Sequence, residues 1–382
     1  MSMIYLDNAA SSWPKPPRVA EKMAECVREY AANPGRGSHA LGMRADRVLF
    51  ECRQKVAKLF GVRNSENVVF TQHATEALNL GIKGLLKAGD HVVTSSLEHN
   101  SVRRPLEYLR KEIGIDVTYV QADENGRLKA EDFRSAVREN TRMIVVTHGS
   151  NLTGTLVPVA EIGQVAKEFG VVLMVDACQT AGVYPIDVEE MNIGMLAFTG
   201  HKSLYGPQGT GGLYIAPDLD VQPLLHGGTG GYSERIDQPP TRPDRYESGT
   251  RNTAGLAGLL AGLEFLEEIG LEKIREHEAA LTKRLHKGLM EIPGVTIYGP
   301  PLGEERVPIV SFAVEGFESH EIGFILDRHY QICVRSGLHC SPLAHETVGT
   351  TEAGLVRASI GYFNTEADLD ALVGAVREII GA

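Results

Sequence analysis

The segment MIVVTHGSNLTGTLVPVAEIGQVAKEFGVVLMVDACQ, residues 143–179, decides the fold, because it sets two short apolar runs around one amphipathic stretch. The runs MIVVTH and VVLMVD are rich in valine and isoleucine and have apolar residues on both faces, which is typical of strands in a covered parallel sheet. The stretch between them has the apolar spacing of a helix. The segment therefore predicts a strand–helix–strand unit with parallel strands.

The same alternation extends along the chain on both sides of this unit. The runs NVVF, DHVVTS and DVTYV, between residues 67 and 120, are each followed by an amphipathic stretch. The runs GMLAFTG and GTGGLYIA are expected as two further strands on either side of Lys202. We therefore predict an α/β fold whose large domain has a mostly parallel central sheet flanked by helices.

The pattern of predicted helices and strands changes near residue 254, which predicts a second, smaller domain. Helices are expected over residues 255–268, 271–291 and 319–329 and from residue 365. The apolar runs VPIVSFAV, QICVRS and LVRASI lie among them, which indicates an α+β unit. We predict a large domain over 15–253 and a C-terminal domain over 254–382 that includes the N-terminal segment 1–14. The glycine- and proline-rich segment 227–250 is expected as a long ordered loop or subunit contact.

Composition narrows the classes of function. The 382 residues carry 38 basic and 49 acidic side chains, a net charge of −11, which argues against nucleic acid or an anionic membrane as partner. No apolar run approaches the roughly 20 residues of a membrane span. The start MSMIYLDNAA lacks the features of a signal peptide. Five scattered cysteines without a C-x-x-C pair indicate reduced thiols, so we expect a cytoplasmic protein.

Polar residues follow the predicted strands, at the edge where open parallel sheets bind ligands. These residues are Thr71–Thr75, Leu97–Asn100, Gly149–Asn151, Asp176, Gln179, His201 and Lys202. Together they predict a site for a phosphorylated, aromatic, nitrogen-containing ligand that an amine can attack.

Lys202 and Asp176 carry the central chemistry of this prediction. A partly desolvated lysine beside another cation has a lowered pKa and can form a Schiff base with an aldehyde. The glycines around Lys202 would let the loop lie against a bound ring. Asp176 follows five apolar residues, where a carboxylate stays ionised only beside a cation such as a protonated ring nitrogen. The alternative for Asp176 is a helix N-cap or a backbone-bonded loop aspartate.

Three other positions fit the same ligand. His99 could stack on a flat ring and exchange protons near neutral pH, although such a histidine is often structural. Ala74 and Thr75 open a helix and could bind a phosphate, although threonine is also a common N-cap. Arg357 lies in an apolar strand and suits capture of a carboxylate, the alternative being an internal salt bridge.

A second reactive centre is expected at Cys340, in the segment CVRSGLHCSPLAHETVG. Its neighbours His339 and Arg335 would favour the thiolate, which is the nucleophilic form. A metal site built from His339, Cys340 and His345 is the weaker alternative, because no fourth ligand is evident and the spacing matches no zinc pattern. We therefore predict no metal site.

The motifs taken together resemble a known family. They are YLDNAASS, NPGRGSHALG, ATEALNL, LEHNSV, SNLTGT, DACQTAG, TGHKSLYGPQGTGGLY, ESGTRN and RSGLHC. The chain resembles, from residue 4 to the last helix, the class V, fold-type I pyridoxal-phosphate-dependent enzymes. Within these it is most similar to cysteine desulfurases of the group II, sulfur-mobilisation type.

The resemblance implies how pyridoxal 5′-phosphate would be held. Lys202 would bind it covalently, Asp176 would pair with the pyridine nitrogen, and His99 would stack over the ring and assist proton transfer. The other cofactor-binding residues that it implies are Ala74, Thr75, Asn151, Gln179, Thr199 and His201, with Thr250 reaching in from a partner subunit.

The resemblance also implies a reaction and partners. L-cysteine would bind through Arg357, Arg335 and Asn151, and Cys340 would accept its sulfur as a persulfide while L-alanine is released. The persulfide would serve iron–sulfur cluster or other sulfur-containing cofactor synthesis through an acceptor protein, and the enzyme would be a homodimer. Leu338 departs from the family pattern, which has a histidine there. Selenocysteine lyase, aminotransferase or epimerase activity, or a scaffold in sulfur trafficking, are the alternatives.

Overall fold

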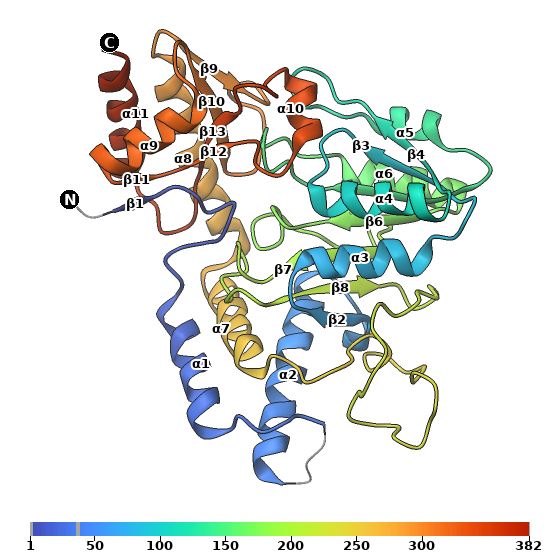
Figure 1. The fold of residues 1–382 in the computed structure, drawn as a ribbon. Helices are drawn as coiled ribbons and strands as arrows, with labels where there is room; N and C mark the ends of the chain where they lie inside the picture. Colours follow the sequence, from blue (N-terminus) through green and yellow to red (C-terminus); the bar gives the residue numbers. More distant parts are fainter. Residues whose placement is uncertain (1–2, 36–38, 382) are drawn as a thin grey trace.

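The large part of the protein is built on a twisted central sheet (Figure 1). The computed structural model describes residues 3–35 and 39–381. Within these residues the sheet has seven strands in the order β2-β8-β7-β6-β5-β3-β4. The strands are β2 (Val68–Thr71), β3 (His91–Ser95), β4 (Asp116–Val120), β5 (Thr141–Thr147), β6 (Val172–Asp176), β7 (Met195–Thr199) and β8 (Gly211–Ile215).

Only β8 runs against its neighbours in this sheet. It pairs antiparallel with β2 and β7, whereas the pairs from β7 to β4 are parallel. Parallel strands need crossover connections, and the helices between them supply these. The predicted α/β fold with a mostly parallel central sheet is therefore confirmed, including the two strands expected around Lys202.

Helices cover both faces of the sheet. They are α1 (Pro17–Glu29), α2 (Ala40–Leu59), α3 (Ala74–Leu85), α4 (Asn100–Glu112), α5 (Ala130–Ala136), α6 (Val159–Phe169) and α7 (Thr253–Ile269), and a short 3₁₀ turn, η1 (Ser65–Asn67), precedes β2. Successive residues of β6 face opposite sides, as the pleat requires. Leu173 and Val175 join the core beneath α2, α5, α6 and α7, and Met174 joins the core beneath α3 and α4.

The C-terminal part has its own sheet and core. Strands β9 (Val295–Tyr298), β10 (Ile309–Val314), β12 (Arg335–Gly337) and β13 (Leu355–Ser359) pair antiparallel in the order β12-β13-β10-β9. The helices of this part are α8 (Leu271–Met290), α9 (Ser319–Tyr330), α10 (Pro342–Val348) and α11 (Glu366–Ile380). From the other end of the chain, β1 (Ile4–Tyr5) pairs parallel with β11 (Ile332–Cys333).

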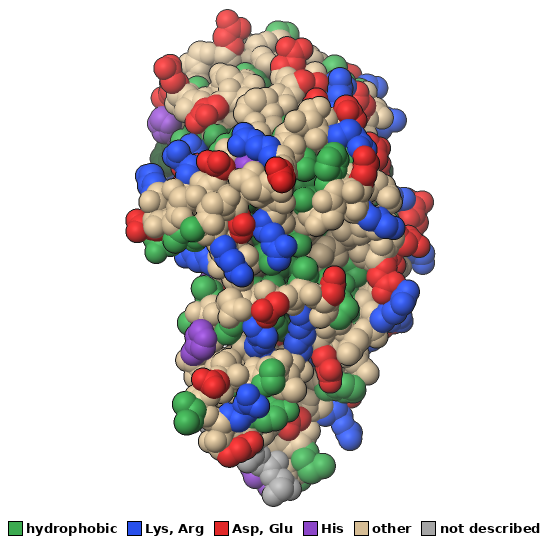
Figure 2. All heavy atoms as spheres, turned by 90° about the vertical axis from the view of Figure 1, so that its right-hand side faces the viewer, with side chains coloured by type: hydrophobic (Ala, Val, Ile, Leu, Met, Phe, Trp, Pro, Cys, Tyr) green, Lys and Arg blue, Asp and Glu red, His purple; other side chains and the backbone are tan. Residues whose placement is uncertain are grey.

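The domain limits near residues 14 and 253 stay predictions. Helix α7 begins at Thr253 and packs against α1 and α2, whereas α8 packs against α11 and β9. Among the residues that the structure describes, no helix combines the length and the apolar character needed to span a bilayer. Figure 2 shows basic and acidic side chains mixed over one face of the molecule.

The segment between β8 and α7 contains no helix or strand, in line with the predicted long loop. Buried Glu247 ties its C-terminal end to the sheet. One Glu247 oxygen accepts hydrogen bonds from the Arg53 guanidinium and, at 2.7 Å, from the Phe70 N–H, and the other accepts from Arg251. This buried cluster compensates charges that would be costly if unpaired.

Replacement of Glu247 tests how strongly this cluster stabilises the fold. We expect E247A to lower the free energy of unfolding by about 3–5 kcal/mol, because Arg53 is left buried without its counter-ion. The control E267A removes an exposed partner of Lys55 and Lys58 and should cost about 0–1 kcal/mol. Urea unfolding followed by circular dichroism measures both, and equal losses would contradict the role of Glu247.

Candidate active site

A cavity of about 210 Å³ opens at the carboxyl ends of the parallel strands, where the sequence places the site. The predicted residues that line it are Ala74, Thr75, His99, Asn151, Asp176, Gln179, Thr199, His201, Lys202, Arg335 and Arg357. Most follow strands β2, β3, β5, β6 and β7, and the two arginines come from the C-terminal sheet. Two predicted residues, Cys340 and Thr250, do not line this cavity.

Lys202 and Asp176 lie at the ends of neighbouring strands. Burial is the main cause that lowers the pKa of Lys202, and Arg357 and Arg335 lower it further, while Cys178 and Asp176 oppose the shift. Asp176 is only 4% exposed, and its Oδ1 accepts a hydrogen bond from the Cys178 N–H at 3.0 Å. The carboxylate is thus held by backbone, as in one of the alternatives, and also faces the cavity that Lys202 lines.

His99 is held as a neutral ring at the start of α4. Its Nδ1 accepts a hydrogen bond from the Ser101 N–H at 3.0 Å and lies 2.8 Å from the Ser101 hydroxyl, which in turn lies 2.9 Å from the Thr75 hydroxyl. Burial, with Lys202 and other cations, lowers the pKa of His99 to about 4. Because Nδ1 accepts, the ring proton of the neutral form lies on Nε2.

One part of the cavity lining fits a phosphate group. Ala74 and Thr75 form the first turn of α3, whose N–H groups have no carbonyl partner within the helix. The Thr199 Oγ1 and His201 Nδ1 atoms are buried and have no hydrogen-bond partner among the described residues. Buried polar atoms are normally paired, so these groups beside a helix N-terminus fit an anion such as the cofactor phosphate.

Arg357 forms an internal salt bridge, which the sequence analysis gave as the alternative to capture of a substrate carboxylate. It is 1% exposed; its Nη2 donates to Asp7 at 2.8 Å and its Nη1 to the Asn151 carbonyl at 2.9 Å. Its Nε has no partner in the described part of the chain. Arg335 lies directly opposite Arg357 in the β12–β13 register. Like charges placed opposite each other repel, so an anion between them would be stabilising.

Gln179 is held close to the N-terminal segment. Its side-chain amide donates to the Ala9 carbonyl at 3.2 Å, and both residues line the cavity. The predicted contact of Gln179 with a phenolic oxygen stays a prediction.

Cys340 is exposed on a turn beside the cavity, between buried His339 and Ser341. The Arg335 Nη2 atom lies 3.5 Å from the Cys340 sulfur, and Arg335 also lines the cavity. Asn151 holds this turn, because its amide donates to the His339 carbonyl at 2.8 Å and its Oδ1 accepts from the Ser341 hydroxyl at 2.5 Å. His339 and Cys340 have φ values of 50° and 60°, which non-glycine residues seldom adopt.

The metal alternative at this turn has no support in the structure. The His339 ring stacks on His345 with centroids 5.8 Å apart, and the His345 Nδ1 pairs with the Thr350 hydroxyl at 2.8 Å. Across residues 3–35 and 39–381, no group of three or more histidine, cysteine, aspartate or glutamate side chains is arranged to hold a metal ion.

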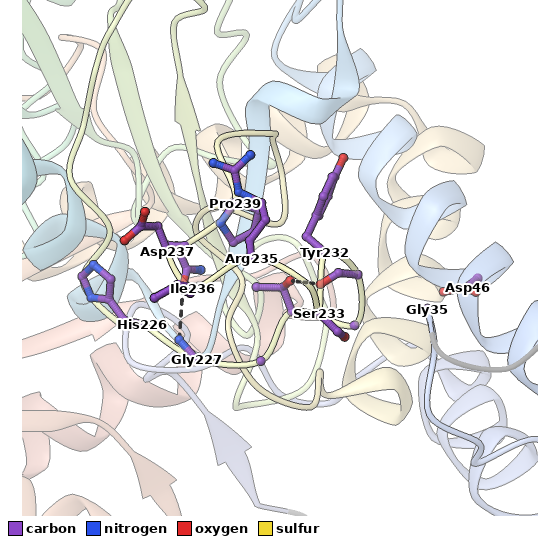
Figure 3. A pocket seen from close by; sticks show the side chains of 15 residues that line it. Gly35, Asp46, His226, Gly227, Tyr232, Ser233, Arg235, Ile236, Asp237 and Pro239 are labelled. Carbon is purple, nitrogen blue, oxygen red and sulfur yellow. Dashed lines mark hydrogen bonds between the residues drawn. The ribbon is translucent and has the colours of Figure 1, made fainter.

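Thr250 lies outside this cavity, in a hollow that Gln72, Glu76 and Gly209 also line. A larger cavity of about 1010 Å³, shown in Figure 3, is lined by residues 226–233 and 235–239 with Gly35 and Asp46. None of the predicted site residues lines that larger cavity.

The structure adds residues to which sequence reasoning gave no role. Asp7 pairs with Arg357, and Ser101 links His99 to Thr75. Asp7 and Ser101 stand in the motifs YLDNAASS and LEHNSV. Their place in these motifs was the signal that the sequence offered for Asp7 and Ser101. Their contacts could not be predicted, because Arg357 is distant in sequence from Asp7 and the contacts of Ser101 depend on where α4 begins.

Comparisons with known proteins agree with this geometry. The family model for class V aminotransferases matches residues 4–372. A probable cysteine desulfurase of Methanothermobacter thermautotrophicus is 40% identical, over 99% of this chain and 95% of its own length. The chain belongs to the class V aminotransferase family. The enzymes of this family depend on pyridoxal phosphate, so the predicted cofactor and the predicted resemblance are confirmed.

Solved structures support the same assignment. The apo structure of a cysteine desulfurase from Thermococcus onnurineus matches with a TM-score of 0.94 and 36% identity, covering 99% of this chain and 95% of that one. An Escherichia coli cysteine desulfurase in an S-sulfonic acid form matches with a TM-score of 0.90 and 28% identity over the same shares. The fold-type I architecture is therefore confirmed for this class V aminotransferase family member.

Thr199 provides a test of the phosphate end of the cavity. We expect T199V to weaken pyridoxal phosphate binding about tenfold, because a hydrogen bond to a charged group contributes ~1.5–3 kcal/mol. Titration followed by visible absorption measures the dissociation constant. The control T94V removes a hydroxyl that donates to the Val145 carbonyl in the same sheet, outside the cavity. Equal affinities of T199V and the wild type would contradict the assignment.

His201 gives a pH test that needs no cofactor. Burial, with Lys202 and Lys15 nearby, lowers the pKa of His201 to about 4. The unfolded state, with a pKa of about 6.5, then binds more protons than the folded state, so stability rises with pH between these values. This slope is set by the difference in the number of bound protons between the unfolded and the folded state. We expect H201Q to lower that difference by about one near pH 5. Urea unfolding of the cofactor-free protein at pH 5 and 6 measures the slope. An unchanged slope in H201Q would contradict the lowered pKa of His201.

Proposed function

We propose that this protein is a pyridoxal-phosphate-dependent cysteine desulfurase that converts L-cysteine to L-alanine and transfers the sulfur to Cys340. The names of its relatives support the reaction. One contact carries the sulfur-transfer step: Arg335 lines the cavity and also reaches the Cys340 sulfur at 3.5 Å. A single side chain thus links the space for the substrate to an exposed thiol.

The residues at the end of the sheet provide acid–base groups. The bound cofactor supplies an electron sink for the substrate. Asp176 would pair with the ring nitrogen of the cofactor and keep it protonated. Lys202, whose pKa burial lowers, is the base that takes and returns the proton at the substrate Cα. Neutral His99 offers its Nε2 proton from a ring that Ser101 holds in place.

The two arginines position the substrate. Arg335 and Arg357 lie opposite each other, and Asp7 compensates only Arg357. A substrate carboxylate beside them offsets the remaining repulsion and forms charge-assisted hydrogen bonds. This contact orients the substrate so that its sulfur points towards the turn that carries Cys340.

The sulfur moves by nucleophilic attack. The Cys340 thiolate attacks the substrate sulfur, an S–S bond forms, and the C–S bond breaks. The electron pair of the broken bond goes to the substrate carbon, which gains a proton and leaves as alanine. Cys340 is exposed, whereas burial raises the pKa of the Cys178 thiol well above its usual value, so Cys178 stays protonated.

The same proposal includes a homodimer in the cytoplasm that passes sulfur to an acceptor protein. Thr250 lies outside the cavity of its own chain, which favours its use by a second copy. The long loop that carries Thr250 offers the surface for such a contact. Persulfide sulfur would then serve the synthesis of iron–sulfur clusters or other sulfur-containing cofactors.

Replacement of Cys340 tests the reaction. We expect C340S to keep the cofactor absorption but to form alanine from cysteine about a hundredfold more slowly, because the nucleophile is lost. Mass spectrometry of the wild type after incubation with cysteine should place an added sulfur on Cys340. The control C333S replaces a half-buried cysteine on β11. A separate variant, K202A, should lose the visible absorption of the bound cofactor. Full alanine formation by C340S would favour an aminotransferase or another reaction without a thiol.

A further inference from the structure

Another hollow, of about 630 Å³, lies between the Cys340 turn and helix α4. We call this hollow the basic groove. Its lining includes Arg103, Arg104, Tyr108, Lys111, Leu338 and Cys340. Cys340 lines this groove but not the cavity that holds Lys202. The thiol is therefore presented to the surface, at a place where another molecule can reach it.

The charge of the groove is opposite to that of the whole chain. Arg103, Arg104 and Lys111 have no ion-pair partner within the described residues. The acidic residue in the lining is Glu107, which accepts hydrogen bonds from Arg110 at 2.7 and 3.0 Å. The chain as a whole carries a net charge of −11. A local positive field of this kind favours a partner with negative charge.

Apolar side chains stand beside these cations. Tyr108 is 52% exposed and Leu338 is 43% exposed, and both line the groove. The Lys83 ammonium group lies 4.7 Å from the centre of the Tyr108 ring, which adds a further cation at the edge. A mixture of cations and exposed aromatic or aliphatic groups is typical of protein interfaces, whereas a small anion would leave the apolar groups uncovered.

The groove is fixed relative to the thiol. The Asn100 N–H, at the start of α4, donates to the Cys340 carbonyl at 2.9 Å. The helix that supplies Arg104, Tyr108 and Lys111 is thus bonded directly to the turn that carries the nucleophile. A partner bound along α4 would have its own groups held at a constant position relative to the Cys340 sulfur.

We propose that the basic groove docks the sulfur-acceptor protein through an acidic segment that also carries an apolar side chain and a cysteine. The inference rests on the proposed desulfurase function. The acidic side chains face Arg103, Arg104 and Lys111, and the apolar side chain packs between Tyr108 and Leu338. The acceptor thiolate attacks the outer sulfur of the Cys340 persulfide, a new S–S bond forms, and Cys340 leaves as a thiolate.

Charge reversal in the groove tests the docking directly. The probe is a fluorescent peptide with one leucine, one serine in place of cysteine and four glutamates, compared with a counterpart that has four lysines. We expect the holoenzyme to bind the acidic peptide at least about tenfold more tightly, with an affinity that falls as salt rises. The variant R103E/K111E should lose this preference.

The control variant K129E/K167E changes the net charge equally. Lys129 caps α5 and Lys167 lies on α6, both are exposed, and these helices cover the other face of the sheet from α4. The variant K129E/K167E should therefore keep the preference for the acidic peptide. Equal binding of both peptides by the wild type, or equal loss in both variants, would overturn the proposal. Binding of mercaptosuccinate at the same groove with the affinity of the acidic peptide would also overturn it, in favour of a small anionic thiol.

Sulfur transfer separates this proposal from the desulfurase assignment. With cysteine-containing peptides, the wild type should pass persulfide sulfur about tenfold faster to the acidic peptide, and R103E/K111E should keep wild-type alanine formation with dithiothreitol as acceptor. Absence of any persulfide on Cys340 would refute the desulfurase function, whereas normal persulfide formation without a charge preference would refute the groove alone.

Discussion

The buried guanidinium of Arg357 joins three parts of the chain that are far apart in sequence. It lies on β13 of the C-terminal sheet, donates to the carboxylate of Asp7 near the N-terminus, and donates to the Asn151 carbonyl after β5. A buried charge is costly unless it is paired and hydrogen-bonded. The arrangement of the C-terminal sheet over the large sheet, and so the wall of the cavity, depends on these contacts being kept.

Burial likewise explains why the histidines of the cavity are neutral although charged side chains line it. Burial lowers the pKa values of His99 and His201 to about 4, so both rings are neutral at pH 7. Burial also lowers the pKa of Lys202. A neutral or easily deprotonated base is what proton transfer at a carbon requires. The fold thus prepares these groups through desolvation, with Asp176 as the carboxylate opposite them.

Separation of the cavity from the exposed thiol divides the chemistry between two surfaces. Arg335 borders both, and Asn151 holds the turn of Cys340 through His339 and Ser341. The cavity can exclude water from the cofactor while Cys340 remains open to a second protein. In the proposed docking, one face of α4 serves recognition, while its first residues position His99 and the Cys340 turn.

The local pattern of the sequence determined the helices, the mostly parallel sheet and the set of groups at its carboxyl edge, because periodicity and strand order constrain them directly. Lys202, Asp176 and His99 were found in this way, since each directly follows an apolar strand or its turn. Family motifs added Thr199. Tertiary structure alone decided that Arg357 pairs with Asp7, that Ser101 orients His99, and that Cys340 faces α4 rather than the cavity. These contacts join residues whose separation along the chain leaves no periodic signal, and only packing determines which charges are buried together.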